Sequence, residues 1–311
     1  MATIGWIGLG NMGGPMTANL VTAGHSVRGF DLSPVALASA AASGVIPATS
    51  IADAVAGADV VFTMLPKGEH ALAVYLGEGG VLDSASPGTL LVDSSTIDMD
   101  SAQRLHDAAA EAGFRIVDAP VSGGISGAEA GTLTFMIGGD TASVAAASVF
   151  IEPMSANIIP TGAATTGQAA KICNNLMLFI NLASTAEGAV LADRLGLDKQ
   201  VFWDIASVSS GDSWALRTWY PVAGVVPSSA ANRDFAPTFT ADLANKDINL
   251  AISAAKATNT PLEMGEHVQR LMQRLIDAGA GAQDCSAIVK LVDGTLGATA
   301  TAAAPAPAPA Q

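Results

Sequence analysis

The first 162 residues alternate short apolar runs with amphipathic stretches, and this alternation constrains the fold more than any other feature of the chain. Six runs have the length and composition of strands: Thr3–Gly8, Ser26–Asp31, Val60–Met64, Leu90–Asp93, Arg115–Ala119 and Leu133–Ile137. Five stretches between them have helical character: Met12–Ala23, Pro34–Ser43, Ser50–Ala56, Glu69–Leu76 and Asp98–Ala112. This order predicts βαβ units, and the continuously apolar runs predict a doubly wound parallel sheet covered on both faces.

After Gly162 the strand pattern stops and helical patterns take over. They cover Thr165–Leu195, Lys199–Val208, Asp242–Ala257 and Pro261–Ala278. We therefore expect an α/β fold with a Rossmann-like nucleotide-binding domain over residues 1–164 and an all-helical domain over residues 165–297. Residues 298–311 are rich in Ala and Pro, which is typical of a disordered tail.

Composition argues against nucleic acid, metal and membrane as partners. A net charge of −14, from 14 basic and 28 acidic residues, disfavours nucleic acid, whose phosphates need a basic surface. The two cysteines, Cys173 and Cys285, lack metal-ligand spacing, so we expect packing thiols in a reducing compartment and no metal. The N-terminus has no basic region before its apolar run, and no long uncharged apolar stretch follows, so we expect a cytoplasmic protein without a membrane span.

A glycine-rich loop connects the first predicted strand to the first predicted helix. Its sequence is Gly8-Leu9-Gly10-Asn11-Met12-Gly13. The first glycine permits a tight turn, the second lets the backbone approach a pyrophosphate, and the third lets helix and strand pack closely. The diphosphate would then lie at a helix N-terminus, where free N–H groups favour negative charge. On its own the motif also fits an ordinary strand–helix turn.

The position of Asp31 supports the interpretation of the glycine loop as a dinucleotide site. It ends the second predicted strand, 23 positions after Gly8, where a carboxylate accepts hydrogen bonds from both ribose hydroxyls. A 2′-phosphate would face the same carboxylate, and Leu32 and Ser33 follow in place of an arginine. The sequence therefore predicts NAD rather than NADP. Leu65-Pro66 after the third strand suits a loop along the nicotinamide ribose, or a simple strand terminator.

Lys171 is the candidate for proton transfer. Lys171, Asn174 and Asn175 stand at i, i+3 and i+4, and the stripe continues through Leu178, Leu182 and Thr185, so this face points inward. Buried amines and amides need partners; the alternative is a lysine that reaches solvent at the helix end. Because an ordinary lysine has a pKa of about 10.4, the role predicts that oxidation is fastest at alkaline pH.

Two further segments are candidates for the substrate side. The turn Ser122-Gly123-Gly124 offers a hydroxyl and N–H groups to a carboxylate, or is merely a flexible turn. Lys246-Asp247 lies in a helical stretch and fits a site or a solvated face. Trp214 and Phe239 fit a pocket wall or core packing.

Together these pieces resemble the β-hydroxyacid dehydrogenase family, and within it the 3-hydroxyisobutyrate dehydrogenases. The matching segments are Gly8–Gly13 through Met16 and Asn19, Leu65-Pro66, Asp93–Thr96, Asp118–Gly124 with Gly131–Leu133, Gly167–Asn175 and Lys246-Asp247. They span nearly the whole chain except the Ala/Pro tail.

The resemblance implies a role for each matched segment. NAD would be held by Gly8, Leu9, Gly10, Asn11, Met12, Gly13, Asp31, Leu65, Pro66 and Thr96, with Lys246 near the nicotinamide. A small hydroxy-acid substrate would be held by Ser122, Gly123 and Gly124, with Trp214 and Asp247 beside it. Lys171 would be catalytic and Asn175 would orient the substrate. The family further implies a homodimer or homotetramer and a place in valine catabolism.

The expected reaction is NAD-dependent oxidation of 3-hydroxyisobutyrate, or a close 3-hydroxy acid, to the semialdehyde. L-Serine dehydrogenase, 3-hydroxypropionate dehydrogenase and tartronate semialdehyde reductase remain open, because small substrate groups are worth only about 1–3 kcal/mol of discrimination. A 6-phosphogluconate dehydrogenase would need a basic phosphate cluster, and Lys171 argues against an imine reductase. A non-catalytic NAD-binding scaffold is the alternative from another class. The substrate's enantiomer, the physiological direction and the oligomer size stay open.

Overall fold

A computed structural model describes residues 1–297; the segment 298–311, with its predicted disordered tail, lies outside the described residues. The chain divides into two compact units. Unit 1 comprises Met1–Leu176 and Leu250–Pro261, and unit 2 comprises Met177–Asn249 and the chain from Leu262 onward. The boundary between the units falls inside two long helices, α9 (Thr166–Arg194) and α12 (Ala241–Thr258).

Unit 1 is built on one sheet. Its strands are β1 (Thr3–Ile7), β2 (Ser26–Phe30), β3 (Ile46–Pro47), β4 (Val60–Thr63), β5 (Leu90–Asp93), β6 (Arg115–Asp118), β7 (Val121–Ser122), β8 (Leu133–Gly138) and β9 (Ser155–Gly162). The order is β3-β2-β1-β4-β5-β6-β8-β7, with β9 paired to β8. All pairs from β3 to β6 are parallel, which confirms the predicted doubly wound parallel sheet.

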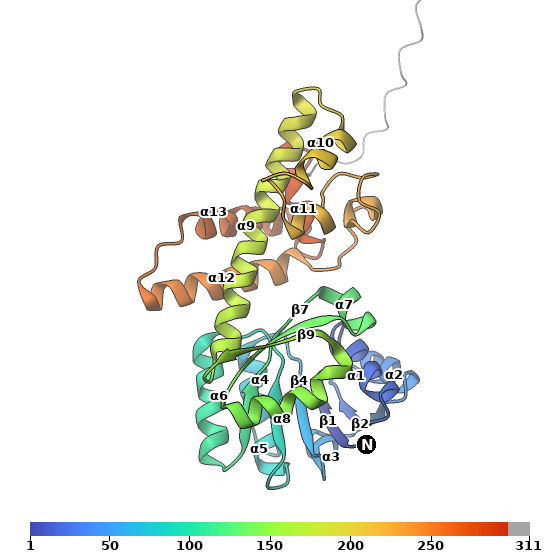
Figure 1. Ribbon diagram of the computed structural model, residues 1–311, viewed down its shortest axis with the longest axis vertical. Coiled ribbons are helices and arrows are strands. Elements are labelled where there is room, and N and C mark those ends of the chain that lie inside the picture. Colours follow the sequence, from blue (N-terminus) through green and yellow to red (C-terminus); the bar gives the residue numbers. More distant parts are fainter. Residues whose placement is uncertain (298–311) are drawn as a thin grey trace, which may run out of the picture. The chain divides into compact units, whose positions relative to one another are not determined.

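Helices cover both faces of this sheet (Figure 1). One apolar core joins the strands to α1 (Gly13–Thr22), α2 (Pro34–Ala42), α7 (Gly124–Ala130) and α8 (Thr141–Ile151). The other joins them to α3 (Ile51–Val55), α4 (Gly68–Leu76), α5 (Val81–Ser84) and α6 (Met99–Glu111). Alternate strand residues enter opposite cores, as the period of a strand requires: Trp6 stacks on Phe62 in the first, while Ile7 and Val61 lie in the second.

Several helices of unit 1 begin at a residue whose side chain caps them. Ser33 accepts a hydrogen bond from the Ala36 N–H and precedes Pro34, a residue suited to the first helical position. Asp98 caps α6 and Asp140 caps α8 in the same way. The predicted helices Pro34–Ser43 and Asp98–Ala112 start within one residue of α2 and α6.

The end of unit 1 differs from the expectation of parallel strands. β8 runs antiparallel to β6 and β7. In unit 1 as a whole, the strands and α-helices that were not predicted are β3, β7, β9, α5, α7 and α8. β9 is mostly exposed and contains Pro160, which an edge strand tolerates but an apolar-run criterion misses. The helix α7 contains Gly127 and spans one or two turns, too short to produce a periodic signal.

Helix α9 is the longest element of the described chain. By length and composition alone it could cross a membrane, a test that the core helix of a soluble protein also passes, and half of its most apolar window is buried.

Unit 2 is helical as predicted, with a small aromatic core. It contains α10 (Lys199–Ala206), α11 (Trp214–Thr218), η2 (Ala230–Arg233), α13 (Glu263–Leu275), η3 (Ile276–Ala280), η4 (Cys285–Ile288) and α14 (Val289–Asp293), besides its parts of α9 and α12. Leu216, Tyr220 and Val226 pack together, and burial raises the pKa of Tyr220 to about 12. The predicted helix Pro261–Ala278 is divided, because α13 passes into the π-helical turn η3.

Candidate active site

The carboxyl ends of five parallel strands meet at one edge of the sheet. Ile7 pairs with both Phe30 and Thr63, Thr63 pairs with Asp93, and Asp93 pairs with Asp118. The segments that follow these residues therefore emerge side by side. β1 lies between β2 and β4, the position at which the strand order reverses and where open α/β sheets bind ligands. The structure thus brings the glycine loop, Asp31, Leu65-Pro66 and Thr96 to a common edge.

Each glycine of the loop has a distinct environment. Gly8 has a φ of +95°, and a Cβ there would collide with the Met64 carbonyl. A Cβ on Gly13 would collide with the Gly8 carbonyl and lie 2.9 Å from Trp6 Nε1. Gly10 is exposed, and a Cβ there would meet no atom within 4 Å. The first and third glycines thus serve the fold, whereas the second leaves open space; Asn11 beside it is exposed and Met12 is half-buried.

Asp31 is fixed against this loop. One carboxylate oxygen accepts a hydrogen bond from the Leu9 N–H at 2.7 Å, and the other accepts one from the Ser33 N–H at 2.7 Å. An acidic group beside an open glycine loop and the start of α1 fits a dinucleotide, whose diphosphate needs the open backbone and whose ribose needs an acceptor.

A chain of buried polar groups connects the loops that follow β4 and β5. Tyr75 is hydrogen-bonded to Thr63, whose hydroxyl donates to Asp93 Oδ1 at 2.7 Å. The Ser95 hydroxyl also donates to Asp93 Oδ1, and it accepts a hydrogen bond from the Leu65 N–H at 2.9 Å. Burial raises the pKa of Asp93, although the bonds from Ser95 and Thr63 oppose that shift. Burial likewise raises the pKa of the Tyr75 hydroxyl.

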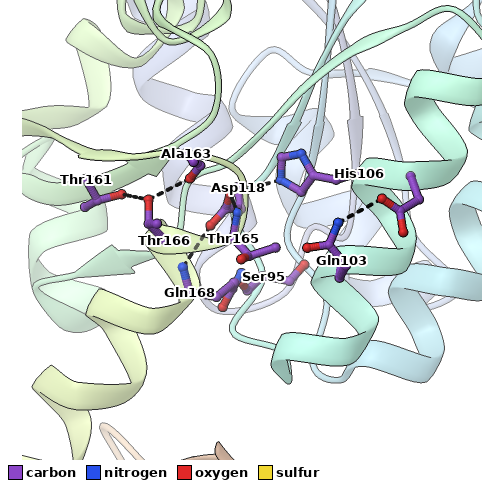
Figure 2. A network of polar contacts seen from close by, with 10 residues as sticks. Ser95, Gln103, His106, Asp118, Thr161, Ala163, Thr165, Thr166 and Gln168 are labelled. Carbon is purple, nitrogen blue, oxygen red and sulfur yellow. Dashed lines mark hydrogen bonds and ion pairs between the residues drawn. The ribbon is translucent and has the colours of Figure 1, made fainter. Parts of the chain in front are cut away.

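Asp118 organises the start of α9 (Figure 2). This buried carboxylate accepts hydrogen bonds from the N–H groups of Thr165 and Gln168, both at 2.8 Å, and contacts His106 Nε2 at 3.0 Å. Thr165 has a φ of +69°, a left-handed conformation that a threonine adopts only when its surroundings hold it. Glycine is required at Gly167, where a Cβ would lie 2.6 Å from the Asp118 carbonyl oxygen.

Lys171 and Asn175 lie one and two turns beyond this start. Lys171 is 8% exposed and Asn175 is 2% exposed. The predicted buried stripe is correct at Leu182 and Thr185, whereas Asn174 is exposed and donates to Asn175 Oδ1 at 3.1 Å. Because the helix turns 100° per residue, the stripe follows i+4 from Lys171 rather than i+3.

The loop Ser122-Gly123-Gly124 joins β7 to α7. Ser122 is half-buried, and both glycines are exposed with φ values of +135° and +66°. These left-handed torsions turn the backbone sharply between strand and helix, so this segment is a defined turn.

The remaining predicted site residues belong to unit 2. Lys246 Nζ lies 3.1 Å from Asp247 Oδ1, and Asp247 is 3% exposed, so the interpretation of this pair as a solvated face is wrong. Trp214 is half-exposed and contacts Trp219, which continues the row through Phe239 to Phe179.

Sequence reasoning gave no role to Asp93, Asp118 or Gln168. The signal for the two aspartates was present, since each ends an apolar strand at the edge that carries the site. Gln168 gave no such signal, because one glutamine in the first turn of a helix is unremarkable in a sequence.

Comparison with known proteins decides the family. Residues 3–162 match the model for the NAD-binding domain of 6-phosphogluconate dehydrogenase. Residues 165–292 match the model described as NAD-binding of NADP-dependent 3-hydroxyisobutyrate dehydrogenase. A probable 3-hydroxyisobutyrate dehydrogenase of Mycobacterium bovis is 47% identical over 289 residues, 93% of this chain and 97% of that protein. The chain belongs to the 3-hydroxyisobutyrate dehydrogenase family. It is therefore an NAD-dependent oxidoreductase with the fold of that family.

Two further relatives bear on the choice of substrate. An NAD-dependent L-serine dehydrogenase of Pseudomonas aeruginosa is 43% identical over 297 residues, 96% of this chain and all of that protein. The solved structure of the Mycobacterium tuberculosis 3-hydroxyisobutyrate dehydrogenase with L-serine has a TM-score of 0.87 and 46% identity, covering 94% of this chain and 99% of that one. Members of this family with similar sequences are thus named for different small hydroxy acids.

Proposed function

We propose that this protein oxidises 3-hydroxyisobutyrate, or a closely related 3-hydroxy acid, to the semialdehyde with Lys171 as the general base. The observation that carries the proposal is the burial of Lys171 on a helix whose first turn is hydrogen-bonded to the ends of β5 and β6. A buried amine close to the cofactor edge of a Rossmann-like sheet supports this role, because such a group can exchange a proton with a substrate hydroxyl.

The chain's own residues bind, orient and deprotonate the substrate. Ser122 and the N–H groups of Gly123 and Gly124 hold the carboxylate through charge-assisted hydrogen bonds. Asn175 hydrogen-bonds the substrate next to Lys171, and Lys171 Nζ takes the hydroxyl proton as the C–H bond at the same carbon breaks. From the family resemblance we assign Lys246 to the cofactor, and Asp247 and Trp214 to the substrate.

The cofactor is held by the glycine loop, Asp31, Leu65, Pro66 and Thr96. NAD⁺, when bound, accepts the hydride and so balances the two electrons lost by the alcohol. Asp31 selects NAD over NADP, because its fixed carboxylate repels a 2′-phosphate.

The test is NADH formation from 3-hydroxyisobutyrate, 3-hydroxypropionate, glycerate and L-serine, with Lys171→Ala beside the unmodified enzyme. Lys171→Ala should lower kcat by about 10²-fold or more while the Kd for NADH changes little. Lys256→Ala removes an exposed lysine of α12 and serves as the matched control. Near-normal turnover of Lys171→Ala refutes the role of this lysine. No turnover of any substrate by the unmodified protein favours a non-catalytic NAD-binding scaffold.

L-Serine dehydrogenation is the second candidate function. Support comes from the 43% identical relative named for that activity and from the related structure that contains L-serine. A kcat/KM higher for L-serine than for 3-hydroxyisobutyrate would select it.

We also propose a cytoplasmic homodimer or homotetramer. Both cysteines are free thiols, which suits a reducing compartment. Exposed apolar side chains of the kind that subunit contacts cover lie on α9 (Leu191), just after it (Leu195) and on α10 (Val201 and Ile205). Light scattering on the eluting protein measures the mass; a monomer at micromolar concentration would contradict the assembly.

A further inference from the structure

We propose that Gln168 is a positioning residue that ties the two cofactor loops to the helix carrying Lys171. The proposal rests on the function proposed above, because that function assigns Thr96 and Leu65 to NAD and Lys171 to proton transfer. It adds a residue that touches neither substrate nor cofactor but sets the distance between the groups that do.

The side-chain amide of Gln168 is hydrogen-bonded to the residues on both sides of Thr96. Its amide nitrogen donates to the Ser95 carbonyl at 2.7 Å, and its amide oxygen accepts from the Ile97 N–H at 3.2 Å. Gln168 is completely buried, and Ser95 and Ile97 are at most 1% exposed. A primary amide supplies a donor and an acceptor on one rigid group, so this side chain binds the backbone of both neighbours of Thr96 at once.

The backbone of Gln168 is fixed from the other direction. Its N–H donates to Asp118 Oδ2 at 2.8 Å, while the Thr165 N–H donates to Asp118 Oδ1 at 2.8 Å. Asp118 is the last residue of β6, so both bonds anchor the first turn of α9 to a central strand of the sheet. Lys171 follows Gln168 by three residues on the same rigid helix.

The connection continues to the second cofactor loop through Ser95. The Ser95 hydroxyl accepts the Leu65 N–H and donates to Asp93, which also binds Thr63 at the end of β4. The segment after β4, the segment after β5 and the start of α9 are therefore linked by direct hydrogen bonds that meet at Ser95 and Gln168, part-buried at Leu65 and buried at the others. None of these links passes through solvent.

A displacement of this junction moves the cofactor and the lysine relative to each other. The hydride leaves the carbinol carbon and the proton leaves the hydroxyl oxygen bonded to it, so turnover needs both acceptors at fixed positions, and a misplacement of about 1 Å can cost about 10²-fold in rate. A role restricted to stability would instead lower the free energy of unfolding without changing cofactor affinity.

The test compares Gln168→Met with two controls. Methionine keeps the volume and removes both hydrogen bonds. Gln103→Met removes an exposed hydrogen bond between Gln103 and Asp107 on α6. Thr89→Val removes a buried hydrogen bond, from Thr89 to the Ala58 carbonyl, at the opposite ends of the strands. It therefore controls for any effect that comes from a loss of stability alone. NADH Kd is measured by fluorescence without substrate, and kcat on the best hydroxy acid at saturating NAD.

Gln168→Met should raise the NADH Kd by about tenfold and lower kcat by about 10- to 100-fold. Both controls should stay within about twofold on each measure. The proposal is overturned if Gln168→Met also stays within that range, or if Thr89→Val shifts Kd and kcat to the same extent. Should Gln168→Met fail to fold, Gln168→Glu is read in the same way, because it keeps the acceptor for Ile97 and loses the donor for Ser95.

The outcome is separable from that of the proposed function. A Gln168→Met variant that behaves as the unmodified enzyme, beside an inactive Lys171→Ala, rejects the junction and leaves the function intact. Unimpaired Lys171→Ala rejects the catalytic assignment, while the NADH Kd still reports on Gln168.

Discussion

The glycine loop allows two neighbouring substitutions with opposite consequences, Gly13→Ala and Gly10→Ala. A methyl group on Gly13 collides with the Gly8 carbonyl and displaces Trp6 Nε1, which donates to that same carbonyl at 2.8 Å. The carbonyl cannot move freely, because the Gly8 N–H is bonded to the Phe30 carbonyl at 2.9 Å. The substitution should therefore damage the contact between β1 and α1.

The magnitudes separate the two variants. For Gly13→Ala, overpacking costs about 1–3 kcal/mol, the unpaired buried indole N–H costs about 1–3 kcal/mol, and better helix propensity returns at most about 1 kcal/mol. We expect a net loss of about 1–6 kcal/mol in the free energy of unfolding. Gly10→Ala meets no protein atom, so stability should change by less than about 0.5 kcal/mol. Its methyl group instead occupies the space for the diphosphate, a clash of about 1–3 kcal/mol that weakens NADH binding by about 5- to 150-fold.

Urea denaturation and fluorescence titration with NADH measure the two effects on each variant. Gly10→Ala should unfold with the unmodified protein and bind NADH weakly. Gly13→Ala should unfold at clearly lower urea. Equal loss of stability in both variants, or unchanged NADH affinity in Gly10→Ala, would refute the division of roles within the loop.

Three further predictions follow from single carboxylates. Asp31→Ala should lower the ratio of kcat/KM with NAD to that with NADP by about 10- to 100-fold, the worth of a charge-assisted hydrogen bond to ribose; equal use of both cofactors by the unmodified enzyme would contradict it. Burial raises the pKa of Asp93, so its protonated form stabilises the fold below the ordinary value of about 3.9, and this contribution is lost as pH rises through the raised value. Asp93→Asn should therefore flatten the fall of Tm as the pH rises above about 4, and an unchanged slope would be the contrary result. Asp284 is buried in unit 2 and accepts hydrogen bonds from both the N–H and hydroxyl groups of Thr238 and Ser286. Asp284→Ala should therefore lower the free energy of unfolding, measured by urea denaturation, by about 3–5 kcal/mol. A loss below about 1 kcal/mol would argue against a stabilising role for this carboxylate.

Prediction from the sequence was strongest where one local pattern decides the outcome. The six apolar runs became strands because a central strand must be apolar on both faces. Prediction was weakest at the edge of the sheet. β9 has neither an apolar run nor clean alternation, and it is a strand because β8 offers it hydrogen-bonding partners.

The sequence by itself determined the order of the elements, the glycine loop, Asp31 and the inward face of Lys171 and Asn175, because each depends on spacing within a short segment. Only the tertiary structure decided which distant groups meet. Asp118 and Gln168 are 50 positions apart, too far for one local pattern to relate them. The pairing of β8 with both β6 and β9 returns the chain to the end of β6, where the two residues are hydrogen-bonded. The physical reason is that a buried polar group needs a hydrogen-bond partner, and the fold can supply that partner from any part of the chain. The distance between two residues along the sequence therefore does not predict which groups pair.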